Sequence, residues 1–168
     1  MKYFPYDMYI AQNTETTSDE QLEQLERQWL QNGRQYGEIY QSLSERLPEE
    51  VHRYFSKLGF HDYRLLKVDI EHESLLRSNA HFTLARNGDD IANRAQWMLT
   101  LENISFFQFE HHNYDNPRPI MHPEIDDWLF EEFTSVDDTT ISLEVLFGSG
   151  GNIRIHFPDK SIRIERIK

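Results

Sequence analysis

The spacing of apolar residues changes once along the chain, near Phe60, and this change constrains the fold more than any other feature. Before Phe60, apolar side chains recur every three or four residues, which places them on one face of a helix. After it, they alternate with polar side chains, the pattern of strands that bury one face. The sequence therefore predicts an α+β protein, with N-terminal helices followed by a mostly antiparallel sheet.

The first helix has a clear start. Ser18 and Gln21 form a capping box, and acidic residues occupy the first turn, where the helix dipole favours them. The apolar stripe that follows continues to Leu47 and is interrupted by Gly33, a weak helix former. The stripe predicts either one long helix or two helices that meet near Gly33.

A second, short helix is expected directly after this stripe. Pro48 suits a first-turn position, because its missing N–H has no partner there in any helix. Gly59 suits the left-handed conformation that often follows a helix end. We expect this helix to end within a residue or two of Leu58.

The sheet is expected to contain four strands before residue 110 and three at the C-terminus. The first four lie over residues 64–70, 81–84, 97–101 and 104–109, with Leu66, Val68 and Ile70 on one face of the first. Residues 128–133 fit either a strand or a short helix. The last three strands, within residues 141–167, are joined by short loops, so we expect a three-stranded antiparallel meander.

Length and composition favour one domain without metal-thiolate or disulfide chemistry. The 168 residues fit a single domain, with a helical part over about 1–59 and a sheet part over about 60–168. There is no cysteine, no apolar run long enough to span a membrane and no apolar segment at the start that resembles a secretory signal. We expect a cytoplasmic protein without a cofactor.

A net charge of −12 is the strongest bulk signal. Such a surface repels phosphate backbones unless a basic stripe overcomes its field, and the arginines and lysines are scattered. A nucleic-acid partner is therefore not expected. The charge suits a basic protein partner, or serves only to keep the chain in solution.

Histidines near residue 111 offer a possible metal site. His111, His112 and His122, with Glu124 and Asp126 nearby, include side chains that bind zinc, iron or manganese. Adjacent histidines on a strand point to opposite faces, and the spacing matches no known metal motif. We expect these histidines not to converge. The adjacent pair His61-Asp62 lies between a helix end and a strand, and is expected to be structural.

The densest run of carboxylates offers a candidate protein-binding surface. Interfaces commonly place aromatic anchors at the centre and charges around them. The run contains both kinds of side chain: Glu124, Asp126, Asp127, Trp128, Phe130, Glu131, Glu132 and Phe133. The alternative is an ordinary solvated face above a buried core.

Two short stretches carry a resemblance. The opening Met1-Lys2-Tyr3-Phe4 resembles that of an uncharacterised bacterial family found mainly in bacilli and their relatives. The junction Phe60-His61-Asp62, which leads into a strand, is similar to one in that family and in several immunity proteins of bacterial toxin systems. The resemblance implies no catalytic residues, and it implies a non-enzymatic protein that binds and blocks a toxin.

Three functions are therefore considered, in this order. The first is non-enzymatic protein binding, with immunity to a cognate toxin as its most specific form. The second is a metal-dependent hydrolase that uses the region of His111, His112 and His122. The third is a small-ligand or regulatory module.

Overall fold

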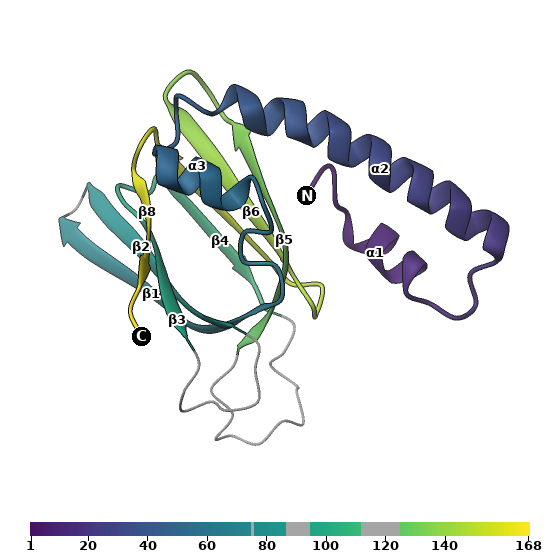
Figure 1. The fold of residues 1–168 in the computed structure, drawn as a ribbon. Coiled ribbons are helices and arrows are strands. Elements are labelled where there is room, and N and C mark those ends of the chain that lie inside the picture. Colours follow the sequence, from purple (N-terminus) through teal and green to yellow (C-terminus); the bar gives the residue numbers. More distant parts are fainter. Residues whose placement is uncertain (75, 87–94, 112–124) are drawn as a thin grey trace.

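Helices occupy the first third of the chain. The computed structural model describes residues 1–74, 76–86, 95–111 and 125–168. The helices are α1 (Tyr6–Gln12), α2 (Asp19–Ser42) and α3 (Glu49–Phe55). Figure 1 shows α3 against the sheet, while α1 and the first half of α2 extend beyond it. None of the described helices is long and apolar enough to cross a membrane.

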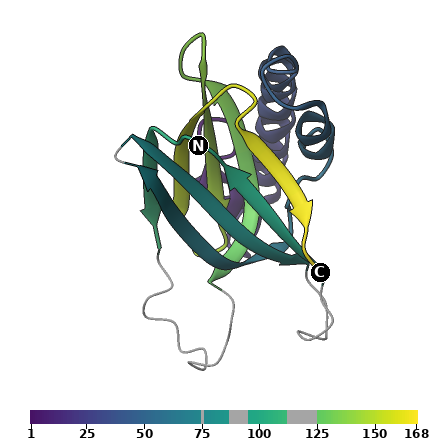
Figure 2. The same cartoon turned by 90° about the vertical axis from the view of Figure 1, so that its left-hand side faces the viewer.

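An antiparallel sheet follows the helices. In the described part of the chain it contains eight strands, in the spatial order β4-β7-β6-β5-β1-β2-β3-β8. Figure 2 shows α2 and α3 on the same side of it. The strands are β1 (Tyr63–Ser74), β2 (Arg77–Arg86), β3 (Gln96–Leu101), β4 (Phe106–Glu110), β5 (Asp126–Ser135), β6 (Thr140–Phe147), β7 (Asn152–Pro158) and β8 (Ile162–Arg166).

The sheet closes on itself, because its short strands are halves of two long bent strands. β3 leads into β4, and β7 leads into β8, while β3 pairs with β8 and β4 pairs with β7. The register is nearly continuous across the bend, since Leu101 lies opposite Ile162 and Phe106 lies opposite His156. At the bend, the N–H of Glu102 donates to the carbonyl of Ser161 at 2.8 Å. The two ends of the strand order are therefore joined through this corner.

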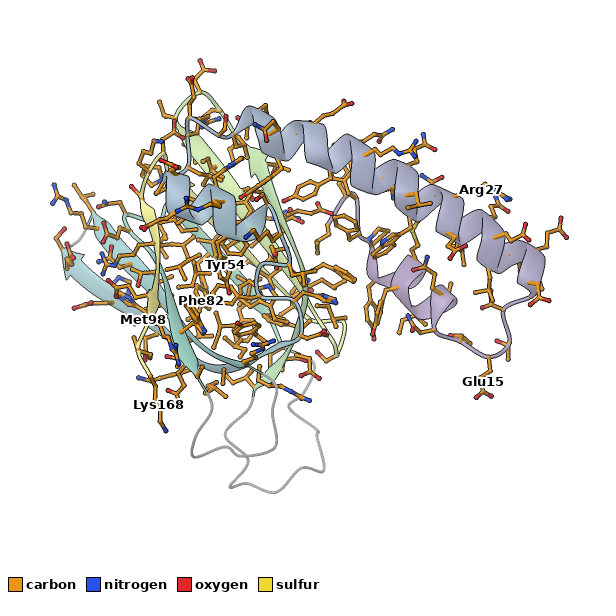
Figure 3. The ribbon with its side chains drawn as sticks, viewed as in Figure 1. Glu15, Arg27, Tyr54, Phe82, Met98 and Lys168 are labelled. Carbon is orange, nitrogen blue, oxygen red and sulfur yellow. The ribbon has the colours of Figure 1, made fainter. Side chains whose placement is uncertain are left out.

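Aromatic side chains fill the space that the sheet encloses. Trp128 is fully buried at its centre, with the ring of Phe60 at 5.7 Å and that of Phe147 at 6.1 Å, both edge to face. Phe82, labelled in Figure 3, lies in the same space. Leu43, Leu47, Val51 and Phe55 bring the helical part into this core.

The expected helices form, with one boundary misplaced. The capping box of Ser18 is present, and α2 is one continuous helix through Gly33. The short helix after Pro48 ends at Phe55, three residues before Leu58, so the expected end is wrong. The chain then continues through turns to Gly59, whose φ is +52°. Helix α1 has no counterpart in the prediction.

The expected strands also form, but two details differ. Residues 128–133 lie in strand β5. In β1 a bulge follows Leu65, so Leu65 is buried in place of Leu66. The three C-terminal strands are present and β6 pairs with β7, but the meander is wrong at its last member, because β8 pairs with β3. A short loop joins neighbours in a flat sheet, whereas here it carries the chain around the corner.

The position of β8 can be tested with disulfides, because the natural chain has no cysteine. Met98 and Glu165 lie directly opposite each other in the β3–β8 ladder. We expect the double variant Met98→Cys/Glu165→Cys to cross-link on oxidation, since opposite Cα atoms lie within disulfide range.

The matched control is Arg154→Cys/Arg166→Cys, a pair that would meet only if β8 folded back along β7. Cross-linking is read from the shift in mobility on a non-reducing gel and from peptide mass. Efficient cross-linking of the control pair, without that of the first pair, would contradict the closed sheet.

Candidate functional site

A bulge in β5 determines where its acidic side chains point. Leu129 is the extra residue, because Trp128 and Phe130 lie opposite consecutive residues of β6. In a regular strand, side chains three positions apart point to opposite faces. The bulge removes this offset, so Trp128 and Glu131 both face the interior, whereas Phe130 and Glu132 face outward.

Glu131 opens into a cavity of about 330 Å³ between α2, residues 55–61 and β5. Aromatic residues from these elements and from the N-terminal segment supply much of its wall. We call it the Glu131 cavity, and its lining is Phe4, Tyr36, Gly37, Tyr40, Phe55, Ser56, Lys57, Leu58, His61, Leu129, Phe130 and Glu131.

Only one of the two carboxyl oxygens of Glu131 has a hydrogen-bond partner among the described residues. Its Oε2 accepts a hydrogen bond from Trp128 Nε1 at 2.6 Å, whereas Oε1 accepts none from the described residues. Burial raises the pKa of Glu131 to about 8, although the indole N–H opposes the shift. The group is therefore mostly protonated at neutral pH, and can donate a hydrogen bond or give up its proton to a base.

Gly59 makes room for this carboxyl group. A Cβ atom at Gly59 would lie 2.0 Å from Glu131 Oε1 and 2.8 Å from Phe55 Cδ1, closer than any side chain can approach. Its φ of +52° also belongs to the left-handed region that favours glycine. Residue 59 therefore cannot carry a side chain while Glu131 keeps this position.

The two tyrosines of the cavity are fixed by hydrogen bonds to the backbone. Tyr36 Oη accepts from the N–H of Phe133 at 2.9 Å, and Tyr40 Oη donates to the carbonyl of His52 at 3.0 Å. Burial raises the pKa of both phenols, so they remain neutral. Tyr36 thereby joins α2 to β5, and Tyr40 joins α2 to α3.

His61 and Asp62 hold the bulged part of β5. His61 Nδ1 donates to the carbonyl of Leu129, and its ring stacks on Phe130 at 5.2 Å. The N–H of Asp62 donates to the carbonyl of Trp128 at 3.1 Å. These contacts join the pair to β5, a strand distant in sequence, and not to the adjacent helix end or strand start. His61 also lines the cavity.

The remaining carboxylates of the predicted surface point in other directions. Asp126 is 2% exposed, and its Oδ2 accepts from Ser149 Oγ at 2.5 Å. Asp127 forms an ion pair with Arg64 at 2.5 Å. Asp126 and Asp127 therefore lie at the start of β5, away from the contacts that Glu131 makes.

Glu132 binds the start of the chain on the outer face of β5. It is 2% exposed, and its two oxygens accept the backbone N–H groups of Lys2, Tyr3 and Phe4 at 2.6–2.8 Å. Phe130, on the same face, packs against Phe4 at 5.6 Å. The N-terminal segment thus lies against the outer face of β5.

The structure brings together only part of the predicted set. Phe130 and Glu131 both line the cavity, although they point to opposite faces of β5. Trp128 is buried beneath it, and Glu132 binds the N-terminal segment instead. Glu124, His112 and His122 lie outside the described residues. His111 is described; its Nε2 is buried without a hydrogen-bond partner in the described part of the chain.

Among residues 1–74, 76–86, 95–111 and 125–168, no three His, Asp or Glu side chains lie close enough together to hold a metal ion. The predicted non-convergence of His111, His112 and His122 stays a prediction, since two of them are not described.

Sequence reasoning missed most of the cavity wall. Tyr36, Tyr40 and Phe55 have the spacing of ordinary core positions, and Phe4 precedes any recognisable element. The one local signal is Gly59, whose left-handed conformation indicates a close approach but not which group approaches. Comparison of the chain with protein-family models, with curated proteins and with solved structures finds no match.

The raised pKa of Glu131 predicts a pH-dependent stability. Between about pH 4.5 and 8 the folded protein keeps this proton and the unfolded chain has lost it. The free energy of unfolding should therefore fall as pH rises through this window, by up to about 1.4 kcal/mol per pH unit from this group. Glu131→Gln should remove that component.

Urea unfolding at several pH values measures the effect, with Glu165→Gln on the exposed part of β8 as the control. Parallel profiles for the natural protein and Glu131→Gln would show that Glu131 ionises normally in the folded state.

The contacts of Glu132 predict a second effect. Glu132→Gln loses a charged acceptor for three N–H groups, and hydrogen bonds to charged groups contribute about 1.5–3 kcal/mol. We expect a loss of that order in the free energy of unfolding. Hydrogen exchange at Lys2, Tyr3 and Phe4 should accelerate selectively, and unchanged protection at these amides would contradict the contact.

Proposed function

We propose that this protein is a non-enzymatic binding protein that recognises a basic protein partner through its projecting helices. The observation that carries the proposal is the arm, defined as α1 and the first half of α2 (residues 6–30). No residue of the arm is buried, and Figure 1 shows it extending beyond the sheet. Because this helix pair contributes no buried residue to the core, its position supports a role in binding and not in stabilising the fold.

The arm combines acidic and apolar side chains. A groove of about 410 Å³ lies along the start of α2, lined by Gln12, Asp19, Leu22, Glu23 and Glu26. We call it the arm groove. Leu30 is 60% exposed on the same helix, one turn beyond Glu26. Carboxylates beside the apolar side chain of Leu22 are complementary to a basic side chain with an aliphatic stem.

The carboxylates of the arm groove are available to a partner. Glu23 pairs with Arg27 at 3.5 Å, but both side chains are more than two-thirds exposed. Such a pair contributes only a few tenths of a kcal/mol, so a partner's cation can replace it. The net charge of −12 would add long-range attraction, which speeds association more than it strengthens binding.

Immunity to a cognate toxin is the most specific form of this proposal. It rests on the resemblance of the Phe60-His61-Asp62 junction to immunity proteins, while the opening Met1-Lys2-Tyr3-Phe4 resembles the uncharacterised bacterial family that shares this junction. In the structure these two stretches meet, since Phe4 and His61 both lie against Phe130. A small-ligand module, the third function considered from the sequence, becomes the second proposal because the Glu131 cavity supports it. The hydrolase proposal has no supporting contact among the described residues.

Charge reversal tests the arm. A partner is sought first as the product of a neighbouring gene, with rescue of growth on co-expression as the sign of immunity. Glu23→Lys/Glu26→Lys should slow association at least tenfold at low salt and flatten its salt dependence, because exposed charges act within a Debye length of about 10 Å at 0.1 M salt. Stopped-flow kinetics measures both quantities.

Glu49→Lys/Glu50→Lys is the matched control. It changes the net charge equally, on the exposed first turn of α3, where Glu49 also has an arginine four residues later. Equal slowing by both variants would attribute the effect to net charge alone. Unchanged kinetics in the arm variant would place the contact surface elsewhere, and failure of both neighbouring gene products to bind would refute the immunity form.

A further inference from the structure

The Glu131 cavity combines an aromatic wall with a carboxyl group. Phe4, Tyr36, Tyr40, Phe55 and Phe130 contribute rings from the N-terminal segment, α2, α3 and β5. The negative faces of aromatic rings attract organic cations, and aromatic cages recognise alkylated ammonium groups. At about 330 Å³ the cavity is within the size range of small-ligand sites.

In its ionised form, the carboxyl group at the floor of the cavity has one oxygen without a hydrogen-bond donor from the described residues. Trp128 Nε1 holds Glu131 Oε2 at 2.6 Å and thereby fixes the carboxyl group. Oε1 has no hydrogen-bond donor in the part of the chain that the structure describes. A ligand with one N–H or a positive charge would supply what this oxygen lacks.

Two backbone features place the carboxyl group there. The bulge at Leu129 turns Glu131 inward, and Gly59 leaves the space that Oε1 occupies. If β5 were regular, or if residue 59 carried a side chain, an apolar core could still form here. The carboxyl group of Glu131 could not then occupy its present position. Bulges that re-aim a side chain are common beside functional sites.

We propose that the Glu131 cavity binds an organic ammonium group, with Glu131 as its counter-ion and the aromatic side chains as its wall. This site is distinct from the arm groove and does not depend on a protein partner for the arm. The ammonium group is either that of a free alkylamine or that of a lysine side chain, and both present the same chemistry to the cavity.

Besides Glu131, the titratable side chains that line the cavity are two tyrosines, a lysine and a histidine. From α2, Tyr36 and Tyr40 face it as neutral phenols, and from residues 55–61 it is faced by Lys57 and His61. Lys57 is exposed at the rim, and His61 uses Nδ1 to bind the carbonyl of Leu129. An anionic ligand would instead lie against Glu131 in a chain of net charge −12.

Binding of a cation should release a proton, because Glu131 is mostly protonated below about pH 8. Affinity should therefore increase with pH up to this value and become constant above it. A neutral ligand of the same shape has no such dependence.

Calorimetric titration with n-butylammonium, and with 1-pentanol as its neutral counterpart, tests the site. We expect n-butylammonium to bind at least tenfold more tightly at pH 9 than at pH 6, with proton release detected from the buffer dependence of the heat. Glu131→Gln should weaken binding at least tenfold and abolish the pH dependence. It resembles the protonated acid, so it should stay folded, and Glu165→Gln is the matched control.

Nα-acetyl-lysine-N-methylamide distinguishes the two sources. Binding of this amide without n-butylammonium would assign the site to a peptide's lysine, and binding of both would assign it to amines generally. Equal affinity for n-butylammonium and 1-pentanol, an unaffected Glu131→Gln variant, or no binding of either amine would overturn the proposal. Glu23→Lys/Glu26→Lys leaves the cavity intact, so the two proposals fail independently.

Discussion

The hydrogen bonds of Glu132 are the interaction on which the arrangement of helices and sheet depends. Its carboxylate accepts three consecutive backbone N–H groups from residues 2–4, which fixes the N-terminal segment on the outer face of β5. Phe4 is thereby held between Trp29 of α2 and Phe130 of β5, at 5.0 and 5.6 Å. This cluster and the hydrogen bond from the Phe133 N–H to Tyr36 Oη together fix α2 against β5, and with it the place of Tyr36 in the cavity wall.

Glu131 and Glu132 are neighbours in sequence but differ in environment. Glu132 has a full set of donors, which suits a buried charge. Glu131 has one indole N–H, and burial among aromatic side chains keeps its proton on. The bulge at Leu129 creates this difference, because it sets which of the two faces inward. A strand without the bulge would exchange their surroundings.

Local sequence patterns were sufficient to predict the helices and strands, but not to predict which strands and side chains pair with one another. The capping box of Ser18 and the alternation of apolar residues predicted helices and strands, because both depend on neighbours in sequence. β8 was misplaced because its pairing depends on closure of the whole sheet. The bulge at Leu129 broke the alternation that would have identified β5. The acidic run was expected to face a partner or solvent, but the N–H groups that satisfy Glu132 lie about 130 residues away in sequence, which no local pattern can indicate.

The raised pKa of Glu131 also explains how the protein can fold without a ligand although an acidic side chain lines an apolar cavity. In the empty protein the carboxyl group is neutral, so the core carries no uncompensated charge. At pH 7, removing a proton from a group of pKa about 8 costs about 1.4 kcal/mol. A unit positive charge at 4 Å returns about 4 kcal/mol at an effective dielectric constant of 20. The attraction exceeds the cost of ionisation, and the difference offsets part of the free energy needed to desolvate the ammonium group. A neutral ligand of the same shape would leave the proton in place.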